Sequence, residues 1–143
     1  MPTNEIQVRI ADWHHDYPEL SRIREAVFIT EQSVPPELEW DGEDAEAIHF
    51  LACEAGYPIG TARLLKDGHI GRVAVLKEWR GLRAGVRLVE AAVHEAEKLG
   101  FRRQQLSAQV HATEFYERLG FQARGQEYLE AGILHIDMQR DSE

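Results

Sequence analysis

The sequence predicts a single α+β domain over residues 1–143, built on a mixed, mostly antiparallel sheet with helices on both faces. Two observations lead to this fold class. Apolar segments joined by short turns between His49 and Val75 indicate three consecutive antiparallel strands. A strand, a long amphipathic helix and another strand then follow between Ile70 and Ala108, which is the order of a central parallel crossover.

The N-terminal part is expected to contribute one strand and one helix. Ile6, Val8 and Ile10 alternate with polar residues, as in a half-buried strand. A helix over residues 18–31 follows, and Val34-Pro35-Pro36 ends it because proline cannot continue a helix. Its apolar stripe contains Leu20, Ile23, Val27 and Phe28. Its polar positions are Ser21, Arg22, Arg24 and Glu25.

The middle of the chain reads as an irregular acidic segment followed by the three-strand meander. Residues 37–47 are rich in carboxylates and are expected to form one helical turn at most. The strands are then predicted over residues 49–54, 59–65 and 70–75. Gly56-Tyr57-Pro58 and Lys66-Asp67-Gly68-His69 supply the turns between them.

The last part is predicted to contain the long helix, a crossover strand and three short elements. The long helix runs over residues 85–99, and Gly100 is a natural C-terminal cap. Its buried face is predicted to contain Val86, Val89, Val93, Ala96 and Leu99. A strand over residues 104–108 and a short helix over residues 113–119 follow. A final pair of short strands begins at Phe121 and ends at Ile133–Met138.

Composition narrows the class of protein. The formal net charge is −9, which argues against general nucleic-acid binding because that depends on Lys and Arg at phosphates. The single cysteine, Cys53, excludes an internal disulfide and a multi-cysteine zinc site, and the seven histidines show no ligand spacing, so no metal is expected. Cys53 itself is expected to be a core residue. No run approaches the ~18 apolar residues of a membrane span, and no signal peptide is evident at the N-terminus, so a cytoplasmic location is expected.

Charge is divided unevenly along the chain. Residues 30–55 contain eight acidic residues and no Lys or Arg, whereas residues 63–87 contain seven basic residues and two acidic ones. This division fits two solvated surfaces of opposite sign. It also fits an anion-holding segment beside a segment that attracts a cationic ligand.

The segment Trp79–Val86 is the strongest candidate for the anion-holding site. It places Arg80, Gly81, Arg83 and Gly85 immediately before the long helix, whose first N–H groups lack partners within the helix. Taken alone this loop is only moderately specific, because many helices begin after a glycine. It matches neither a Walker A loop nor a GxGxxG fingerprint.

A second segment, His111–Phe121, adds the residues Phe115-Tyr116 and Gly120-Phe121. Together the two segments resemble the GNAT-superfamily N-acetyltransferases, in which an Arg/Gln-x-x-Gly-x-Gly/Ala loop precedes an Ala-x-x-Phe-Tyr-x-x-x-Gly-Phe segment. Two positions depart from the family pattern: Arg83 stands where the first loop glycine is expected, and His111 stands where an asparagine is common.

The N-terminal half also resembles one branch of that superfamily. Arg24-Glu25-Ala26-Val27-Phe28, Glu31-Gln32 and, further on, an aspartate and His49 are similar to the small bacterial ElaA-like and YjcF-like proteins. The order of elements matches the family over nearly the whole chain.

The resemblance implies acetyl-CoA as co-substrate and direct transfer of its acetyl group to a primary amine within a ternary complex. The backbone around Val73 and Val75 would bind the pantetheine arm and polarise the thioester carbonyl. The amides from Arg83 to Arg87 would hold the pyrophosphate, and Tyr116 would be the general acid for the leaving thiolate. The implied cofactor-binding residues are Val73, Ala74, Val75, Arg80, Gly81, Arg83, Ala84, Gly85, Val86, Arg87, His111 and Phe115.

Acetyl transfer also needs a neutral amine, so we looked for a general base. Glu31 and His49 are the candidates, with His111 behind them. Each has a simpler interpretation: Glu31 fits a solvated carboxylate at a helix end, and His49 fits a buried histidine with its hydrogen bonds satisfied. Tyr116 equally fits a packed aromatic residue on a short helix.

Three questions stay open at the level of sequence. The acidic segment makes a cationic acceptor plausible, such as a polyamine, an aminoglycoside-like amine, an amino-acid derivative or a peptide amine. Alternative functions are a non-catalytic acyl-CoA-binding regulatory module and an acyltransferase with a longer acyl donor. A homodimer is expected from the resemblance alone.

Overall fold

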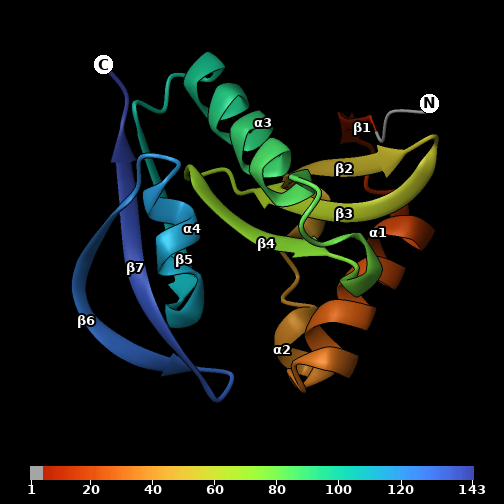
Figure 1. The fold of residues 1–143 in the computed structure, drawn as a ribbon, viewed down its shortest axis with the longest axis horizontal. Helices are drawn as coiled ribbons and strands as arrows, with labels where there is room; N and C mark the ends of the chain where they lie inside the picture. The colour runs from red at the N-terminus through yellow and green to blue at the C-terminus, as the bar shows by residue number, and fades with distance from the viewer. Residues whose placement is uncertain (1–4) are drawn as a thin grey trace.

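The computed structural model describes residues 5–143 of the chain (Figure 1). Residues 1–4 lie outside the described residues. They include the start of the N-terminal segment in which no signal peptide was expected. The strands are β1 (Ile6–Ala11), β2 (Ile48–Glu54), β3 (Tyr57–Leu64), β4 (His69–Val75), β5 (Arg103–Gln109), β6 (Gln122–Glu130) and β7 (Ile133–Asp141). The α-helices are α1 (Tyr17–Arg24), α2 (Pro36–Glu39), α3 (Ala84–Lys98) and α4 (Thr113–Glu117).

Shorter helical segments connect these elements. A π-helical segment, η1 (Glu25–Glu31), continues α1. It ends at Glu31, which is also the predicted end of the helix ahead of Pro35 and Pro36. Three 3₁₀ turns follow along the chain: η2 (Asp44–Glu46), η3 (Lys77–Trp79) and η4 (Val110–Ala112).

One seven-stranded sheet contains the strands in the order β1-β2-β3-β4-β5-β7-β6. All neighbouring strands are antiparallel except β4 and β5, which are parallel because α3 connects them as a crossover. The mixed, mostly antiparallel sheet with a central strand–helix–strand unit is therefore confirmed. β4 and β5 pair through only two positions, His69 with Gln105 and Ile70 with Leu106, and beyond these the two strands separate.

Helices cover both faces of the β1–β4 part of the sheet (Figure 1). Leu88, Val89 and Ala92 of α3 pack on the face that contains Phe50. Leu20, Ile23 and Val27 of α1 and η1 pack on the opposite face, which contains Leu51. The adjacent β2 residues Phe50 and Leu51 therefore pack in two different hydrophobic cores, because successive side chains of a strand point to opposite faces of the sheet.

The buried stripe of α3 differs from the predicted one at both ends. Val89, Val93 and Ala96 are buried as expected, but Val86 is only half-buried and Leu99 is 53% exposed. Leu99 is the C-cap residue, and the chain turns away at Gly100, whose φ is +94°. The Phe101 N–H donates to the Ala96 carbonyl and the Gly100 N–H to the Glu97 carbonyl, which is a Schellman cap.

Three further expectations were wrong in detail. Ile10 is 54% exposed, because only the Ile6 end of β1 packs against the α3 core. Arg24, predicted on the polar side of its helix, is 1% exposed and is bound by buried carboxylates. The last two strands are not short: β6 and β7 contain nine residues each and form a long hairpin.

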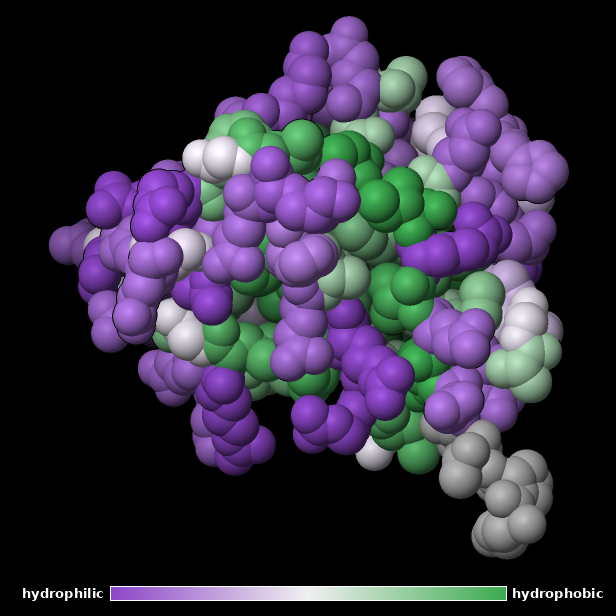
Figure 2. Space-filling model, turned by 90° about the horizontal axis from the view of Figure 1, so that it is seen from above, coloured by the Kyte–Doolittle hydropathy of each residue, from purple (hydrophilic) through white to green (hydrophobic). Residues whose placement is uncertain are grey.

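The surface is mostly hydrophilic. On the face shown in Figure 2, apolar side chains gather in a band across the middle, with hydrophilic side chains around it. Within residues 5–143, no helix combines the length and the apolar character that crossing a membrane would require.

Candidate functional site

The separation of β4 from β5 opens a cavity of about 1170 Å³. Its walls come from β4, β5, the start of α3, the end of η1 and the tip of the β6–β7 hairpin. Most residues predicted for the site line this one cavity: Glu31, Val73–Val75, Arg80, Gly81, Arg83–Val86, His111, Phe115 and Tyr116.

The N-terminus of α3 forms one end of the cavity. Arg83 is its N-cap residue and adopts the left-handed conformation, with φ +70° and ψ 14°. The first main-chain hydrogen bond of the helix runs from Arg87 N–H to Arg83 O, so the N–H groups of residues 84–86 have no acceptor within the helix. A Cβ atom at Gly85 would lie 3.3 Å from the Phe115 ring, so glycine here lets α3 approach that ring closely.

The edge of β4 forms the floor. The Leu76 N–H donates to Ile59 O on the β3 side at 2.9 Å. Because main-chain groups alternate in direction along a strand, Val73 and Val75 direct theirs toward β5. β5 has already separated at this level, so the main-chain groups of Val73 and the Val75 N–H have no partner on β5, whereas Val75 O accepts a hydrogen bond from Arg80.

Arg80 and Glu31 hold each other across the mouth of the cavity. Arg80 donates two hydrogen bonds to the Glu31 carboxylate, at 2.6 and 2.7 Å, and its Nε donates to Val75 O at 2.9 Å. These bonds from Arg80 lower the pKa of Glu31, against the opposing effect of burial. The predicted base and a predicted anion-binding residue therefore bind one another.

Tyr116 stands in the cavity wall on α4. Its ring packs edge-on against Phe115 and Phe121, with centroids 5.0 and 5.9 Å away. Burial raises the pKa of the Tyr116 hydroxyl to about 12, so the phenol stays protonated at neutral pH. No hydrogen bond joins this hydroxyl to any other residue in the described range, so it is available to a ligand.

Two predicted residues lie elsewhere. His49 is 1% exposed, stacks on Trp13 and bonds through Nε2 to the Asp44 carbonyl at 2.8 Å. Burial lowers its pKa, and its side chain is not part of the cavity wall. Arg87 donates to Ile6 O at 2.7 Å and lines a separate cavity of about 1100 Å³ beside β1.

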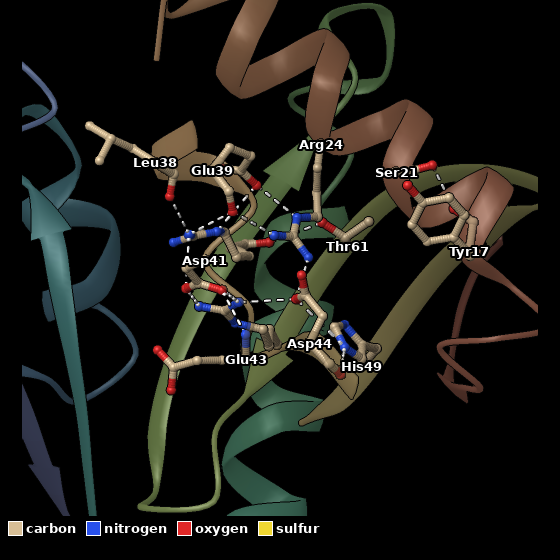
Figure 3. Close-up of polar contacts among 12 residues, drawn as sticks. Tyr17, Ser21, Arg24, Leu38, Glu39, Asp41, Glu43, Asp44, His49 and Thr61 are labelled. Atoms are coloured by element: carbon tan, nitrogen blue, oxygen red, sulfur yellow. Dashed lines mark hydrogen bonds and ion pairs between the residues drawn. The ribbon is translucent and has the colours of Figure 1, made fainter. Parts of the chain in front are cut away.

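A network of three arginines and three carboxylates lies beside the cavity (Figure 3), and four of its members, Glu39, Asp41, Arg63 and Arg72, line the cavity wall. Arg24 donates to Glu39 and Asp44, both at 2.7 Å. Arg63 donates to Asp44 at 3.0 Å and makes two hydrogen bonds to Asp41. Arg72 completes the network with bonds to Asp41 at 3.2 Å and to the Glu39 carbonyl at 3.0 Å.

This network fastens the acidic segment to the sheet. Burial is the largest single effect on Asp41 and opposes its ionisation, but the hydrogen bonds from Arg63 and the Glu43 N–H, together with the charges of Arg63 and Arg72, outweigh it and hold the pKa of Asp41 at about 2. The carboxylates of Glu31, Glu39, Asp41, Asp44 and Glu46 are all paired with a basic side chain. Most of the negative charge that the composition assigns to residues 30–55 is thus neutralised within the protein.

Sequence reasoning missed the polar residues of β5 and β7. Gln109 receives a hydrogen bond from His111 Nε2 at 2.6 Å and donates one to Gln32 Oε1 at 2.8 Å, which bridges β5 to η1. His135 and Ser107 also line the cavity. No sequence motif marks these residues, because only the pairing of β5 with β7 brings them to the site.

Two remaining features of the chain are its possible metal ligands and Cys53. Over residues 5–143, no three His, Cys, Asp or Glu side chains are grouped so as to hold a metal ion. Cys53 is half-buried and lies in the α1 core rather than in the β4–β5 cavity, and burial raises the pKa of its thiol.

Comparison with known proteins agrees with this architecture. Residues 15–142 match the model of the acetyltransferase (GNAT) domain, so the chain belongs to the GNAT family and is an N-acetyltransferase. Enzymes of this family transfer acyl groups from acyl-CoA to amines.

The relatives include members of the predicted branch. The uncharacterized N-acetyltransferase YjcF of Bacillus subtilis is 35% identical, over 83% of this chain and 88% of that protein. The crystal structure of Escherichia coli ElaA superposes with a TM-score of 0.84 at 28% identity, covering 96% of this chain and 100% of ElaA. An acyl-CoA N-acyltransferase from Pseudomonas aeruginosa gives a TM-score of 0.82 at 32% identity, covering 95% and 99%. The expected likeness to ElaA-like and YjcF-like proteins is confirmed.

Proposed function

We propose that this chain, acting as a single domain, uses acetyl-CoA to acetylate a primary amine by direct transfer within a ternary complex. The observation that carries the proposal is one continuous cavity. It joins the free N–H groups at the start of α3, the open edge of β4 and the hydroxyl of Tyr116.

The donor would bind along this path. The pyrophosphate is assigned to the N–H groups of residues 84–86, where the helix dipole also favours an anion. The pantetheine amides are assigned to the main-chain groups of Val73 and Val75, as a strand would pair with an open edge. Arg80 would exchange its contact with Glu31 for the bound donor, or keep it and hold the loop in place.

The transfer step places the amine on the thioester carbonyl carbon. A C–N bond forms, the C–S bond breaks and the thiolate leaves toward Tyr116. With a pKa of about 12 the phenol stays protonated at neutral pH and can donate a hydrogen bond. Its full proton transfer to a thiolate, whose conjugate acid has a pKa of ~8.5, is uphill by roughly 3–4 pKa units. We therefore assign Tyr116 the stabilisation of the thiolate by a hydrogen bond, while the proton itself comes from the acylated nitrogen.

The acceptor is assigned to the side of the cavity formed by η1, α2 and the β6–β7 hairpin tip. A preference for a cationic amine stays a prediction, and its support from composition is weaker because the acidic residues are mostly ion-paired. Homodimerisation and a cytoplasmic location also stay predictions. Size-exclusion chromatography with light scattering measures the first, and cell fractionation the second.

The test is release of free thiol from acetyl-CoA in the presence of amines, polyamines and peptides. We expect turnover with at least one acceptor and a loss of kcat of about 100-fold in Tyr116→Phe at unchanged acetyl-CoA affinity, the lower end of the effect of removing one oxyanion-type donor. Tyr17→Phe is the matched control, because Tyr17 lies on α1 outside the cavity.

Two outcomes would favour the alternative functions. Thermal stabilisation by acetyl-CoA without thiol release from any acceptor would indicate a binding module. Faster release from longer acyl-CoA donors would indicate a different acyl group.

A further inference from the structure

Resting on the proposed function, we propose that His135 on β7 is the general base that removes the proton from the acceptor ammonium. The cavity lining includes Glu39 and Asp41, which are ion-paired with buried arginines, and Glu130, whose side chain is exposed. The other base candidates that line it, among the described residues, are Glu31, His111, His69 and His135. Their hydrogen bonds and positions distinguish them.

The first three are poorly suited. The Glu31 carboxylate is held by two hydrogen bonds from Arg80, which lower its pKa and make it a weaker base. His111 donates through Nε2 to the amide oxygen of Gln109, so only its Nδ1 could accept a proton, and its side chain is exposed to solvent rather than buried in the cavity wall. His69 pairs with Gln105 at the closed end of the split, where β4 and β5 are still joined.

His135 has the required tautomer. Its Nδ1 lies 2.7 Å from the main-chain carbonyl of Ile133. A carbonyl oxygen only accepts hydrogen bonds, so Nδ1 carries the proton and the neutral ring has its lone pair on Nε2. The ring is 7% exposed and stacks on Tyr128 at 6.1 Å between centroids. Tyr128 is itself fixed by a hydrogen bond from its hydroxyl to Asp137 at 2.6 Å and by contact with the Ser107 hydroxyl.

Strand register places His135 level with a β4 residue assigned to the donor arm. The last β4–β5 pair joins Ile70 to Leu106, and three residues further along lie Val73 on β4 and Gln109 on β5. His135 is paired directly with Gln109. Paired residues on neighbouring antiparallel strands point to the same face, and Gln109 reaches toward Gln32 on η1. His135 therefore lies on the acceptor side, level with Val73, one of the β4 residues assigned to the donor arm.

The charged group nearest to Nε2 of His135 comes from the neighbouring strand β6. Glu130 on β6 has its Oε2 atom 3.9 Å from Nε2, and it would pair with the imidazolium. The other titratable groups on β5, β6, β7 and η4 are Arg103, Arg124, Glu127, Tyr128, Asp137, Arg140, Asp141 and His111, and of these Tyr128 stacks on the His135 ring. Asp137 is bound by Tyr128, and β5 presents the neutral Gln109.

Every proton in the proposed reaction has a donor and an acceptor. The ammonium gives one proton to Nε2 and becomes a neutral amine. The amine attacks the thioester carbon, the C–S bond breaks, and a second nitrogen proton passes to the thiolate to give the free thiol. The imidazolium then returns its proton to water.

The decisive variant is His135→Asn, because the Asn side-chain nitrogen can still donate to Ile133 O but cannot take a proton. We measure kcat/KM for the amine against pH. In the wild-type enzyme a histidine base gives a falling acid limb. In His135→Asn we expect a loss of about 100-fold or more at neutral pH. We also expect the rate to rise continuously with pH as free amine accumulates, with acetyl-CoA affinity within twofold of wild type.

A second variant separates a base from a structural residue. Glu130→Gln removes the anion 3.9 Å from Nε2 but keeps the imidazole, so the acid limb should persist in this variant. His94→Gln, on the exposed side of α3, is the control and should leave the profile unchanged. A His135→Asn enzyme with the wild-type acid limb and a rate within threefold of wild type would overturn the proposal. Absence of any wild-type turnover would instead overturn the proposed function.

Discussion

Replacing Arg83 with glycine should stabilise the protein. Arg83 occupies the left-handed region, which costs a residue with a Cβ atom roughly 1–2 kcal/mol. Glycine removes that cost but adds about 0.5–1 kcal/mol of unfolded-state entropy. The Arg83 side chain is exposed and makes no hydrogen bond or ion pair with another residue of the described range, and glycine keeps the main-chain carbonyl that accepts from Arg87 N–H, so little else is lost. The net gain is about 0.5–1 kcal/mol, or about 2–4 °C in Tm for a domain of this size.

The assay is thermal unfolding followed by circular dichroism without ligand, with Arg83→Ala as the matched control. Alanine removes the same guanidinium but keeps the Cβ atom, so its Tm should stay close to wild type. The reasoning is refuted if Arg83→Gly is no more stable than Arg83→Ala. Acetyl-CoA affinity gives a second comparison: glycine should bind more tightly than alanine, because its main chain can approach the pyrophosphate more closely while both variants lack the charge.

Two further stability predictions concern the carboxylates. Asp44→Ala leaves Arg24 and Arg63 without the carboxylate that they share. We expect the free energy of unfolding in urea to fall by about 3 kcal/mol, near the lower end for a broken buried ion pair, because each arginine keeps another carboxylate. The control is Glu43→Ala at an exposed neighbouring position, which should change the free energy of unfolding by less than about 0.5 kcal/mol. Acid should also destabilise the protein through Asp41, whose pKa of about 2 lies below the ordinary 3.8. Its contribution is complete above pH 3.8 and is lost as the pH falls through 2, so Tm should drop over that interval, and Asp41→Asn should flatten the drop.

Most secondary structure was predictable because it depends on local pattern. The meander strands, the crossover helix and the Gly100 cap follow from alternation, helical spacing and turn residues that lie close together in the sequence. Arg24 shows where this reasoning fails. Its charge predicts a solvated position, and only the folding of residues 36–47 back over η1 brings Glu39 and Asp44 to it.

The site divides in the same way. The residues lining the donor path around Arg80, Gly85 and Tyr116 were named from two contiguous motifs, and the structure gathers them in one cavity. His135 carries no local signal, because it reaches the cavity through a strand pairing with Gln109 that no short motif encodes. Glu31 was named correctly as a cavity residue, but its partner Arg80 is 49 positions away and changes what the carboxylate can do.

The two-residue junction between β4 and β5 has a mechanical consequence for the enzyme. The main-chain ladder that joins the β1–β4 part of the sheet to the β5–β7–β6 part is short, so the stiffness of this joint depends on side-chain packing and on whatever occupies the opening. A donor arm bound to β4 would act as a wedge between the two parts of the sheet. At 100 times its Kd such a ligand adds about 2.7 kcal/mol to stability. We therefore expect amide hydrogen exchange in β4 and β5 to slow on loading, and the enzyme to be most rigid when it is ready to react.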